Sequence, residues 1–415
     1  MRGWLVIIMT VASINMRGQT LKLSQPELFT AYSFSIIGGV PEEFGHTDGE
    51  GTNALFGGTT GLAIDQDGNL YIADALLGGQ TIRKMSPDGM VTTLAGESGI
   101  AGEVDQMGWA ARFHSPHSVT VDQSGNLFVA DSFGQTIRKV TAEGEVTTFA
   151  GLAFTEDSVD GLGEEARFRG PRGITIDKAG NLYVADHSGH TIRKVTPYSD
   201  AVGLVTTLAG RPLARGTNDG AGSAARFSYP SALTMGKDGN IYVADLGSGA
   251  IRRVTPEGVV STLATGFGLL TGIASDSAGN LYVVDSYRHV INKVTPEGAV
   301  STLDDVTGLP IRFKFGADHS SIAIDKDDNI YVADAGDNTI LKAAAPPKVV
   351  TLFLSLTAQD PFQSAMVVTE ATLDLRVWLP IQTNFVVGST ATRIVDTNAP
   401  NFPHHFYRAR RLQGF

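Results

Sequence analysis

Six aspartates recur at the end of one short motif, and this repetition is the first sign of chemistry in the sequence. Each copy reads approximately Asp-x-x-Gly-Asn-(Leu/Ile)-Tyr-(Val/Ile)-Ala-Asp and is followed by a segment such as Thr-Ile-Arg-Lys. A ring of carboxylates could bind a metal ion or act in acid–base catalysis. A residue found in every copy more simply serves a need that all copies share, so we expect these carboxylates to accept backbone N–H groups in the turn that follows. The closing aspartates are Asp74, Asp131, Asp186, Asp245, Asp285 and Asp334.

Arginine follows the aspartate in four of the copies. These residues are Arg83, Arg138, Arg193 and Arg252, and they could pair with the carboxylates. In the last two copies Asn292 and Leu341 take the arginine position. The aspartate therefore does not depend on the arginine.

Other acidic segments bear on metal and phosphate binding. The segments from Asp65 to Asn69 and from Asp325 to Asn329 begin like calcium loops, but a loop of about twelve residues also needs a downstream glutamate. Here the chain enters a strand pattern almost at once, so we interpret both as hairpin turns.

Asp-Gly-x-Gly segments at Asp48, Asp160 and Asp219 lack the lysine and the helix of a phosphate-binding loop. Phe56, Phe113, Phe168 and Phe227 follow these connections, and we expect them to pin each connection over its sheet.

The elements that carry these residues form a four-stranded unit. In the second copy, Thr120 to Asp122 leads through a turn at Gly125 into Asn126 to Ala130, and two more strand patterns follow. Second strands such as Leu70 to Ala73 are apolar at every position, as expected for a sheet covered on both faces. Six such blades around a ring cover one another, which predicts an all-β, six-bladed β-propeller. A two-sheet sandwich would leave one face of each strand polar.

The sixth unit lacks a fourth strand, whereas an unpartnered strand pattern precedes the first unit. We expect the segment from Ser33 to Ile37 to supply the outer strand of the last blade and so remove an open edge. The competing segment for this role is Val349 to Leu356.

The repeat resembles the NHL repeat, whose family forms six-bladed propellers. The resemblance rests on the six copies of Gly-x-x-x-Asp-x-x-Gly-Asn-(Leu/Ile)-Tyr-(Val/Ile)-Ala-Asp and covers about Tyr32 to Lys342. Some relatives bind RNA through basic surfaces. Others are metal-dependent lyases or lactonases that hold the metal at the channel mouth, so the resemblance leaves an enzyme open as an alternative.

The ends of the chain predict two further parts. Met1 to Gly3 followed by an apolar run to Ile14 resembles a secretory signal peptide, assigned to residues 1–18, and this run is too short to span a bilayer. We assign residues 30–345 to the propeller and residues 348–415 to a small C-terminal β-rich accessory module, which resembles a segment found on large exported bacterial proteins. The alternative for this segment is a capping extension of the propeller. The chain has no cysteine, so an exported form would have no disulfide.

The residues that differ between repeats are the candidates for binding. The residues that start the first strands form an inner ring at the channel mouth, made of Thr60, His117, Arg172, Ser231, Thr271 and Ser320. Neighbouring loops on the same face add His187, His190, Tyr287, Arg288 and His289, with Trp109 on a longer excursion. From these we select Thr60, His117, Arg172, His187, Tyr287 and Arg288 as candidate ligand-binding residues. A zinc set of His117, His187 and His289 would require loops to bring all three together.

These features favour an exported, non-enzymatic binding or scaffold protein that engages a protein, peptide or glycan. The alternative is a propeller enzyme, lyase-like or lactonase-like, with a metal at the channel mouth. The net charge of -11 disfavours nucleic acid as a partner. We assign no catalytic residue, no metal ligand and no cofactor, and we expect no membrane span and a secreted or periplasmic location.

Overall fold

The computed structural model describes residues 32–76, 78–303, 313–316 and 319–344, and also the backbone of seven strands nearer the ends of the chain. The chain divides into two compact units, which are described separately. One is Tyr32–Ala345, and the other combines Met1–Ala31 with Pro346–Phe415. Among the described residues, no helix is long and apolar enough to cross a membrane.

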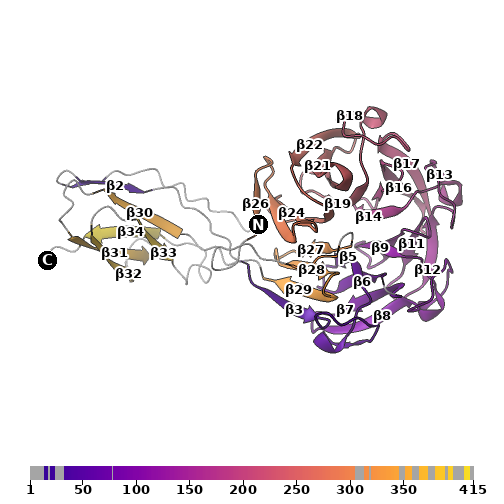
Figure 1. The fold of residues 1–415 in the computed structure, drawn as a ribbon, viewed down its shortest axis with the longest axis horizontal. Helices are drawn as coiled ribbons and strands as arrows, with labels where there is room; N and C mark the ends of the chain where they lie inside the picture. Colours follow the sequence, from indigo (N-terminus) through magenta and orange to yellow (C-terminus); the bar gives the residue numbers. More distant parts are fainter. Residues whose placement is uncertain are drawn as a thin grey trace. The chain divides into compact units, whose positions relative to one another are not determined.

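The unit Tyr32–Ala345 is a ring of six antiparallel sheets, or blades, with the first strand of each blade nearest the centre (Figure 1). The innermost strands are β5 (Thr59–Ile64), β9 (Pro116–Val121), β14 (Pro171–Ile176), β19 (Pro230–Met235), β23 (Leu270–Ser275) and β27 (Ser321–Ile324). The second strands are β6 (Leu70–Asp74), β10 (Leu127–Asp131), β15 (Leu182–Asp186), β20 (Ile241–Asp245), β24 (Leu281–Asp285) and β28 (Ile330–Asp334). All residues of these second strands are buried, because neighbouring blades cover both of their faces.

The outer strands complete each blade. The third strands are β7 (Thr81–Met85), β11 (Thr136–Val140), β16 (Thr191–Ser199), β21 (Ala250–Val254), β25 (Val290–Val294) and β29 (Thr339–Ala343). The fourth strands of blades one to five are β8 (Met90–Gly96), β12 (Val146–Ala150), β17 (Val202–Gly210), β22 (Val259–Thr265) and β26 (Val300–Thr302). Blades one, three and four gain a short fifth strand that the sequence did not predict: β4 (Gly49–Glu50), β13 (Gly161–Leu162) and β18 (Gly220–Ala221). Single 3-10 turns are η1 (Gly51–Asn53), η2 (Gly108–Ala110), η3 (Gly163–Glu165), η4 (Gly222–Ala224) and η5 (Leu246–Ser248).

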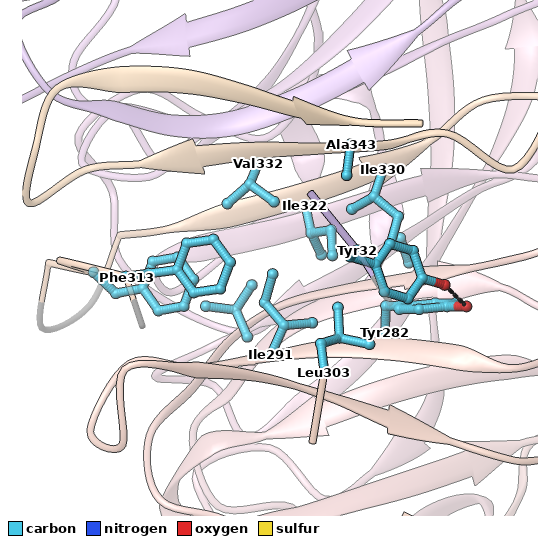
Figure 2. Packing of buried hydrophobic residues seen from close by; sticks show 12 residues of the cluster. Tyr32, Tyr282, Ile291, Leu303, Phe313, Ile322, Ile330, Val332 and Ala343 are labelled. Atoms are coloured by element: carbon cyan, nitrogen blue, oxygen red, sulfur yellow. Dashed lines mark hydrogen bonds between the residues drawn. The ribbon is translucent and has the colours of Figure 1, made fainter. Parts of the chain in front are cut away.

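The predicted closure of the ring is confirmed. Strand β3 (Phe34–Gly38) pairs with β29 and completes blade six. Tyr32, just before β3, packs in the apolar cluster between blades five and six, and its hydroxyl lies 2.8 Å from that of Tyr282 (Figure 2). The competing segment does not close the ring, because β30 (Thr351–Thr357) pairs with strands of the other unit.

The first strands approach one another closely around the channel. A Cβ atom added at Gly61 would lie 2.6 Å from Cα of Ser118 and 2.8 Å from the carbonyl oxygen of His117. Gly173 and Gly272 make the same approach in blades three and five. Glycine in the odd blades therefore lets the inner strands pack against larger residues of the even blades.

The second unit contains two sheets whose backbone alone is described. The first has the order β1 (Ile14–Met16), β2 (Gln19–Leu23), β30 and β33 (Ala391–Val395). The second has the order β32 (Leu379–Val387), β31 (Ser364–Thr372) and β34 (Phe406–Arg411). The sequence did not predict that β2 joins the C-terminal strands. Most of the predicted signal peptide lies outside the described residues.

Candidate functional site

The recurring aspartates accept backbone hydrogen bonds, as predicted, but chiefly from a different segment. Asp74 accepts the N–H of Gly57 at 2.9 Å, and Asp131 accepts that of His114 at 2.9 Å. These donors precede the first strand of the same blade, not the turn after the second strand. The reason is antiparallel pairing, which places the end of strand two beside the entry to strand one. Among the described residues, donors from the turn include the backbone N–H groups of Arg288 in blade five and Gly336 in blade six, and the Ser248 hydroxyl in blade four.

A buried arginine links each of these aspartates to its connection in blades one to four. Nη1 of Arg193 donates to Asp186 at 3.2 Å, and Nη2 donates to Asp160 at 2.7 Å. The guanidinium also lies 5.3 Å from the ring centre of Phe168, which is fully buried. We call this arrangement the arginine latch. Its four arginines are Arg83, Arg138, Arg193 and Arg252, each over its own phenylalanine.

Blade two modifies the latch with a second carboxylate. Oε2 of Glu103 accepts hydrogen bonds from Arg138 at 3.1 Å and from Thr136 at 3.0 Å. Burial raises the pKa of Asp131 well above its ordinary value, and the neighbouring Glu103 carboxylate raises it further. Glu103 could not be recognised from the repeat pattern, because no other repeat places an acid at this point.

The Asp-x-x-x-Asn segments are hairpin turns, as predicted. Asp65 accepts the backbone N–H groups of Asp67 and Asn69, and its second oxygen accepts the Asn69 side chain at 2.8 Å. Asp325 makes the same bonds to Asp327 and Asn329. Each carboxylate is thus engaged by its own turn.

In every blade, strands one and three begin on the same side as strands two and four end. We call this side the loop face. On it, short hydroxyl side chains of the inner ring join neighbouring blades. Thr60 bonds the carbonyls of Ala73 in its own blade and of Pro116 in the next, at 3.2 and 2.9 Å. Ser231 does the same with Ala244 and Leu270.

Two members of the ring depart from this pattern with long basic side chains. His117 is only 5% exposed, and its Nε2 has no hydrogen-bond partner among the described residues. Burial holds the pKa of His117 well below its ordinary value, and the positive charge of Arg172 lowers it further. His319 and His187 add to that effect, and the rings of His117 and His319 lie 5.7 Å apart. We call His117, Arg172, His187 and His319 the mouth cluster.

The structure therefore brings together three of the six predicted ligand-binding residues. His319 was not predicted, because the repeat pattern places the start of the first strand of blade six one residue later, at Ser320. In blade three it is His187, and not a short hydroxyl, that reaches the next blade: Nδ1 of His187 bonds the Pro230 carbonyl at 3.1 Å. Burial lowers the pKa of His187 to about 3, with Arg172 contributing.

A second group of basic and aromatic residues extends from His187 toward blade four. The ring of Tyr229 lies 5.2 Å from His187 and 4.6 Å from His190. The Arg215 guanidinium lies 5.0 Å from the same ring. Burial lowers the pKa of His190, and Arg215 and Arg169 reinforce the effect. Positive groups therefore continue outward from the channel.

The remaining predicted residues lie in other environments. Tyr287 is 73% exposed in the blade-five turn. Arg288 in that turn bonds the buried Asp285 at 3.0 Å, taking the place of the missing latch arginine. Trp109 is exposed in η2, where Gly108 bonds Gly144 on the opposite side of the blade from the loop face. Across the described part of the chain, no three histidine, aspartate or glutamate side chains are grouped so that they could hold a metal ion.

Solved structures with the same arrangement of blades share the fold. A protein of unknown function from Bacteroides thetaiotaomicron superposes with a TM-score of 0.53 and 18% identity, covering 80% of this chain and 83% of its own. A protein titled a putative gluconolactonase gives a TM-score of 0.50 and 15% identity, covering 78% of this chain and 97% of its own. The class of the molecule is therefore the six-bladed β-propeller.

Sequence comparison identifies the kind of repeat. The NHL repeat model matches residues 168–195, which lie in blade three. NHL repeat-containing protein 2 of Bos taurus is 34% identical over 154 residues, which is 34% of this chain and 21% of that protein. Teneurin-3 of Danio rerio is 26% identical over 234 residues, which is 50% of this chain and 8% of that protein. The matches thus span a small part of these relatives' length. Blade three therefore carries an NHL repeat, and the chain is similar to proteins that contain such repeats.

Proposed function

We propose that this propeller is a non-enzymatic binding module that engages a protein, peptide or glycan through its loop face and acts outside the cytoplasm. The proposal rests on a comparison of three equivalent turns in the connections between blades. Gly99, Phe154 and Leu213 each donate their N–H to a glycine carbonyl in the blade before, at 2.5, 3.0 and 2.9 Å.

All three residues have a left-handed backbone, with φ of 80°, 55° and 61° respectively. Glycine adopts this conformation freely, whereas a residue with a side chain is strained there by about 1 kcal/mol or more. Phe154 and Leu213 nevertheless point large apolar side chains into solvent, with 59% and 53% exposed. Strain combined with exposure supports a role in contact with another molecule.

Neighbouring aromatic residues enlarge this surface. Phe133 is 61% exposed in the blade-two turn, and its ring lies edge-on to His114 at 5.7 Å. Phe154 packs on the same His114 ring, also at 5.7 Å. The two phenylalanines are therefore held in place and exposed together, as expected of a contact surface.

The test uses the full chain on arrays of glycans and peptides, with the variant Phe154→Gly combined with Leu213→Gly. We expect the variant to be at least as stable as the unaltered protein, because strain is relieved, and to lose binding at least tenfold. Tyr198→Ser, which removes an exposed aromatic residue from the opposite side of blade three, is the control and should bind normally. Unchanged binding by the double variant would contradict the proposal, and stoichiometric zinc or calcium in the purified protein would support an enzyme instead.

A further inference from the structure

The connection between blades three and four carries a more specific inference about the partner, which rests on the proposed function. In the two connections before it, a glutamine side chain of one blade accepts a backbone N–H at the entry to the next blade. Gln80 and Gln135 make these bonds at 2.7 and 2.6 Å. Between blades three and four, Nδ1 of His190 accepts the N–H of Tyr229 at 3.2 Å instead. Since glutamine joins the other blades, the join itself requires neither a histidine nor a tyrosine.

Tyr229 has a backbone conformation that is costly for a residue with a side chain. Its φ is 55°, in the left-handed region, and blades one and three have Gly58 and Gly170 at the same position. Such strain is most often retained where a side chain serves a function. We give the name tyrosine junction to the set His190, Leu213, Arg215, Ser228 and Tyr229.

Arg215 is an oriented cation within this junction. Its Nε donates a hydrogen bond to the buried hydroxyl of Ser228 at 2.8 Å, and its guanidinium lies 5.0 Å from the ring centre of Tyr229. Among the described residues, no carboxylate pairs with Arg215, and its two Nη atoms donate no hydrogen bond. The exposed guanidinium is therefore held in place with both Nη atoms open to a ligand.

The carboxylates nearest to the junction are engaged elsewhere. Asp245 is buried and accepts a hydrogen bond from Arg252 in its latch. Glu156 pairs with Arg169 at 3.6 Å. Arg215 thus remains as a permanent positive charge that no described acid balances, although the whole chain is acidic.

His190 adds a hydrogen-bond donor beside the same tyrosine ring. Because Nδ1 accepts a backbone N–H, it carries no proton, so the neutral ring carries its proton on Nε2. A guanidinium likewise only donates. The junction therefore fits acceptor oxygens, and the two oxygens of a carboxylate match the planar fork of Arg215.

We propose that the tyrosine junction binds an acidic peptide segment, in which an aspartate or glutamate carboxylate pairs with Arg215 and a neighbouring large apolar side chain packs on Leu213. Leu213 is 53% exposed and lies in the same connection as Arg215. Nε2 of His190 donates to another oxygen of the bound segment. A free anion would leave Leu213 uncovered, and a sugar acid has no large apolar side chain to cover it.

Arrays of short, C-terminally amidated peptides, probed with the full chain, test this without altering the protein. Each peptide places leucine or phenylalanine beside aspartate or glutamate, and its counterpart carries asparagine or glutamine instead. We expect the acidic peptides to bind at least tenfold more tightly, because the amides cannot form the charged pair with Arg215. Equal binding of the two sets would overturn the proposal. Binding confined to peptides with phosphoserine at the acidic position would also overturn it and would assign a phosphate ligand.

The variant Arg215→Gln identifies the group that recognises the carboxylate. In this variant the acidic peptides and their amide counterparts should bind equally. Because this preference is a ratio measured on one protein, it does not depend on how much of the variant is folded. Arg253→Gln removes an exposed arginine from β21 in blade four and should keep the preference for acidic peptides. A preference that survives in Arg215→Gln, or that is lost equally in Arg253→Gln, would overturn the proposal.

Failure of this inference can be told apart from failure of the proposed function. If acidic peptides show no preference while binding on the arrays still depends on Phe154 and Leu213, the ligand class is wrong but the loop face remains the binding surface. If binding does not depend on Phe154 and Leu213 either, the proposed function itself is wrong.

Discussion

Buried basic side chains occur in two regions of the propeller, the arginine latches and the mouth cluster, and the regions differ in how those side chains are bonded. Both Nη atoms of Arg193 donate hydrogen bonds, and Asp186 and Phe168 surround the group. Among the described residues, the Nε atoms of the four latch arginines and Nε2 of His117 in the mouth cluster are all buried without a hydrogen-bond partner. What distinguishes a latch is that its guanidinium pairs with a buried aspartate. The latch recurs in four blades, whereas the mouth cluster has no repeat. Repetition therefore indicates a contribution to stability, and the departures from it are where we propose that binding occurs.

The largest expected loss of stability comes from removing the arginine of one latch. Arg193→Met leaves the buried carboxylate of Asp186 without its cation, so we expect a loss of about 3–5 kcal/mol in the free energy of unfolding. Denaturant titration measures this loss. Asn292→Met changes the equivalent position of blade five, which has no such pair, and is the matched control. Equal losses in the two variants would mean that the latch has no special role.

A smaller loss is expected from crowding the inner strands. Gly61→Ala places a Cβ atom within 3.0 Å of backbone atoms of blade two, so the strands must move apart. We expect a loss of about 1–3 kcal/mol in the free energy of unfolding. Ser118→Ala, the facing residue, should change it by less than about 0.5 kcal/mol. If Gly61→Ala leaves the free energy of unfolding unchanged, the first strands can move apart without loss of stability.

The mouth cluster should make stability depend on pH. The pKa of His187 is about 3 in the folded protein and about 6.5 in an unfolded chain. The neutral His187 side chain therefore makes its full contribution to the free energy of unfolding above pH 6.5. This contribution is lost as pH falls toward 3, by at most about 1.4 kcal/mol per pH unit.

Comparison with His187→Gln isolates this contribution from that of the buried aspartates, whose raised pKa values act in the opposite direction. Between pH 7 and 5 the unaltered protein should lose up to about 2 kcal/mol more than the variant, measured by urea titration at both pH values. Parallel losses would indicate that His187 is protonated as easily in the folded protein as in the unfolded one.

The smallest loss of stability is expected at Arg288, which takes the place of the latch arginine in blade five. Arg288 pairs with Asp285, but its side chain is 49% exposed, so solvent weakens the interaction. Arg288→Gln should cost about 1 kcal/mol or less in the free energy of unfolding, far less than Arg193→Met. A loss as large as that of Arg193→Met would remove the distinction between buried latch and exposed substitute.

The fold could be predicted from the sequence because it is repeated. The fully apolar second strands, the Gly-Asn hairpins and the unpartnered strand before blade one give the blade count and the closure. Contacts between distant positions could not be predicted in this way. The hydrogen bonds that Asp74 accepts from the N–H of Gly57, and the addition of Glu103 to one latch, depend on how connections fold back over each blade.

Part of the mouth cluster could be identified from the sequence. His117 and Arg172 depart from the short hydroxyl residues at the other inner-ring positions, and such departures from a repeat can be read from one sequence. His319 was missed because its position depends on where β27 begins. Thr60 could not be recognised as a residue that joins blades, since that role depends on a carbonyl in the next blade.

Thermal unfolding and binding on the glycan and peptide arrays, measured in parallel on the unaltered protein, on Arg193→Gln and on Phe154→Gly combined with Leu213→Gly, test the central claim most directly. We predict that Arg193→Gln lowers Tm markedly but keeps binding. The double variant should keep or raise Tm and lose binding at least tenfold. If the double variant lowers Tm as much as Arg193→Gln does, and both variants keep binding, the separation of stability from binding is wrong.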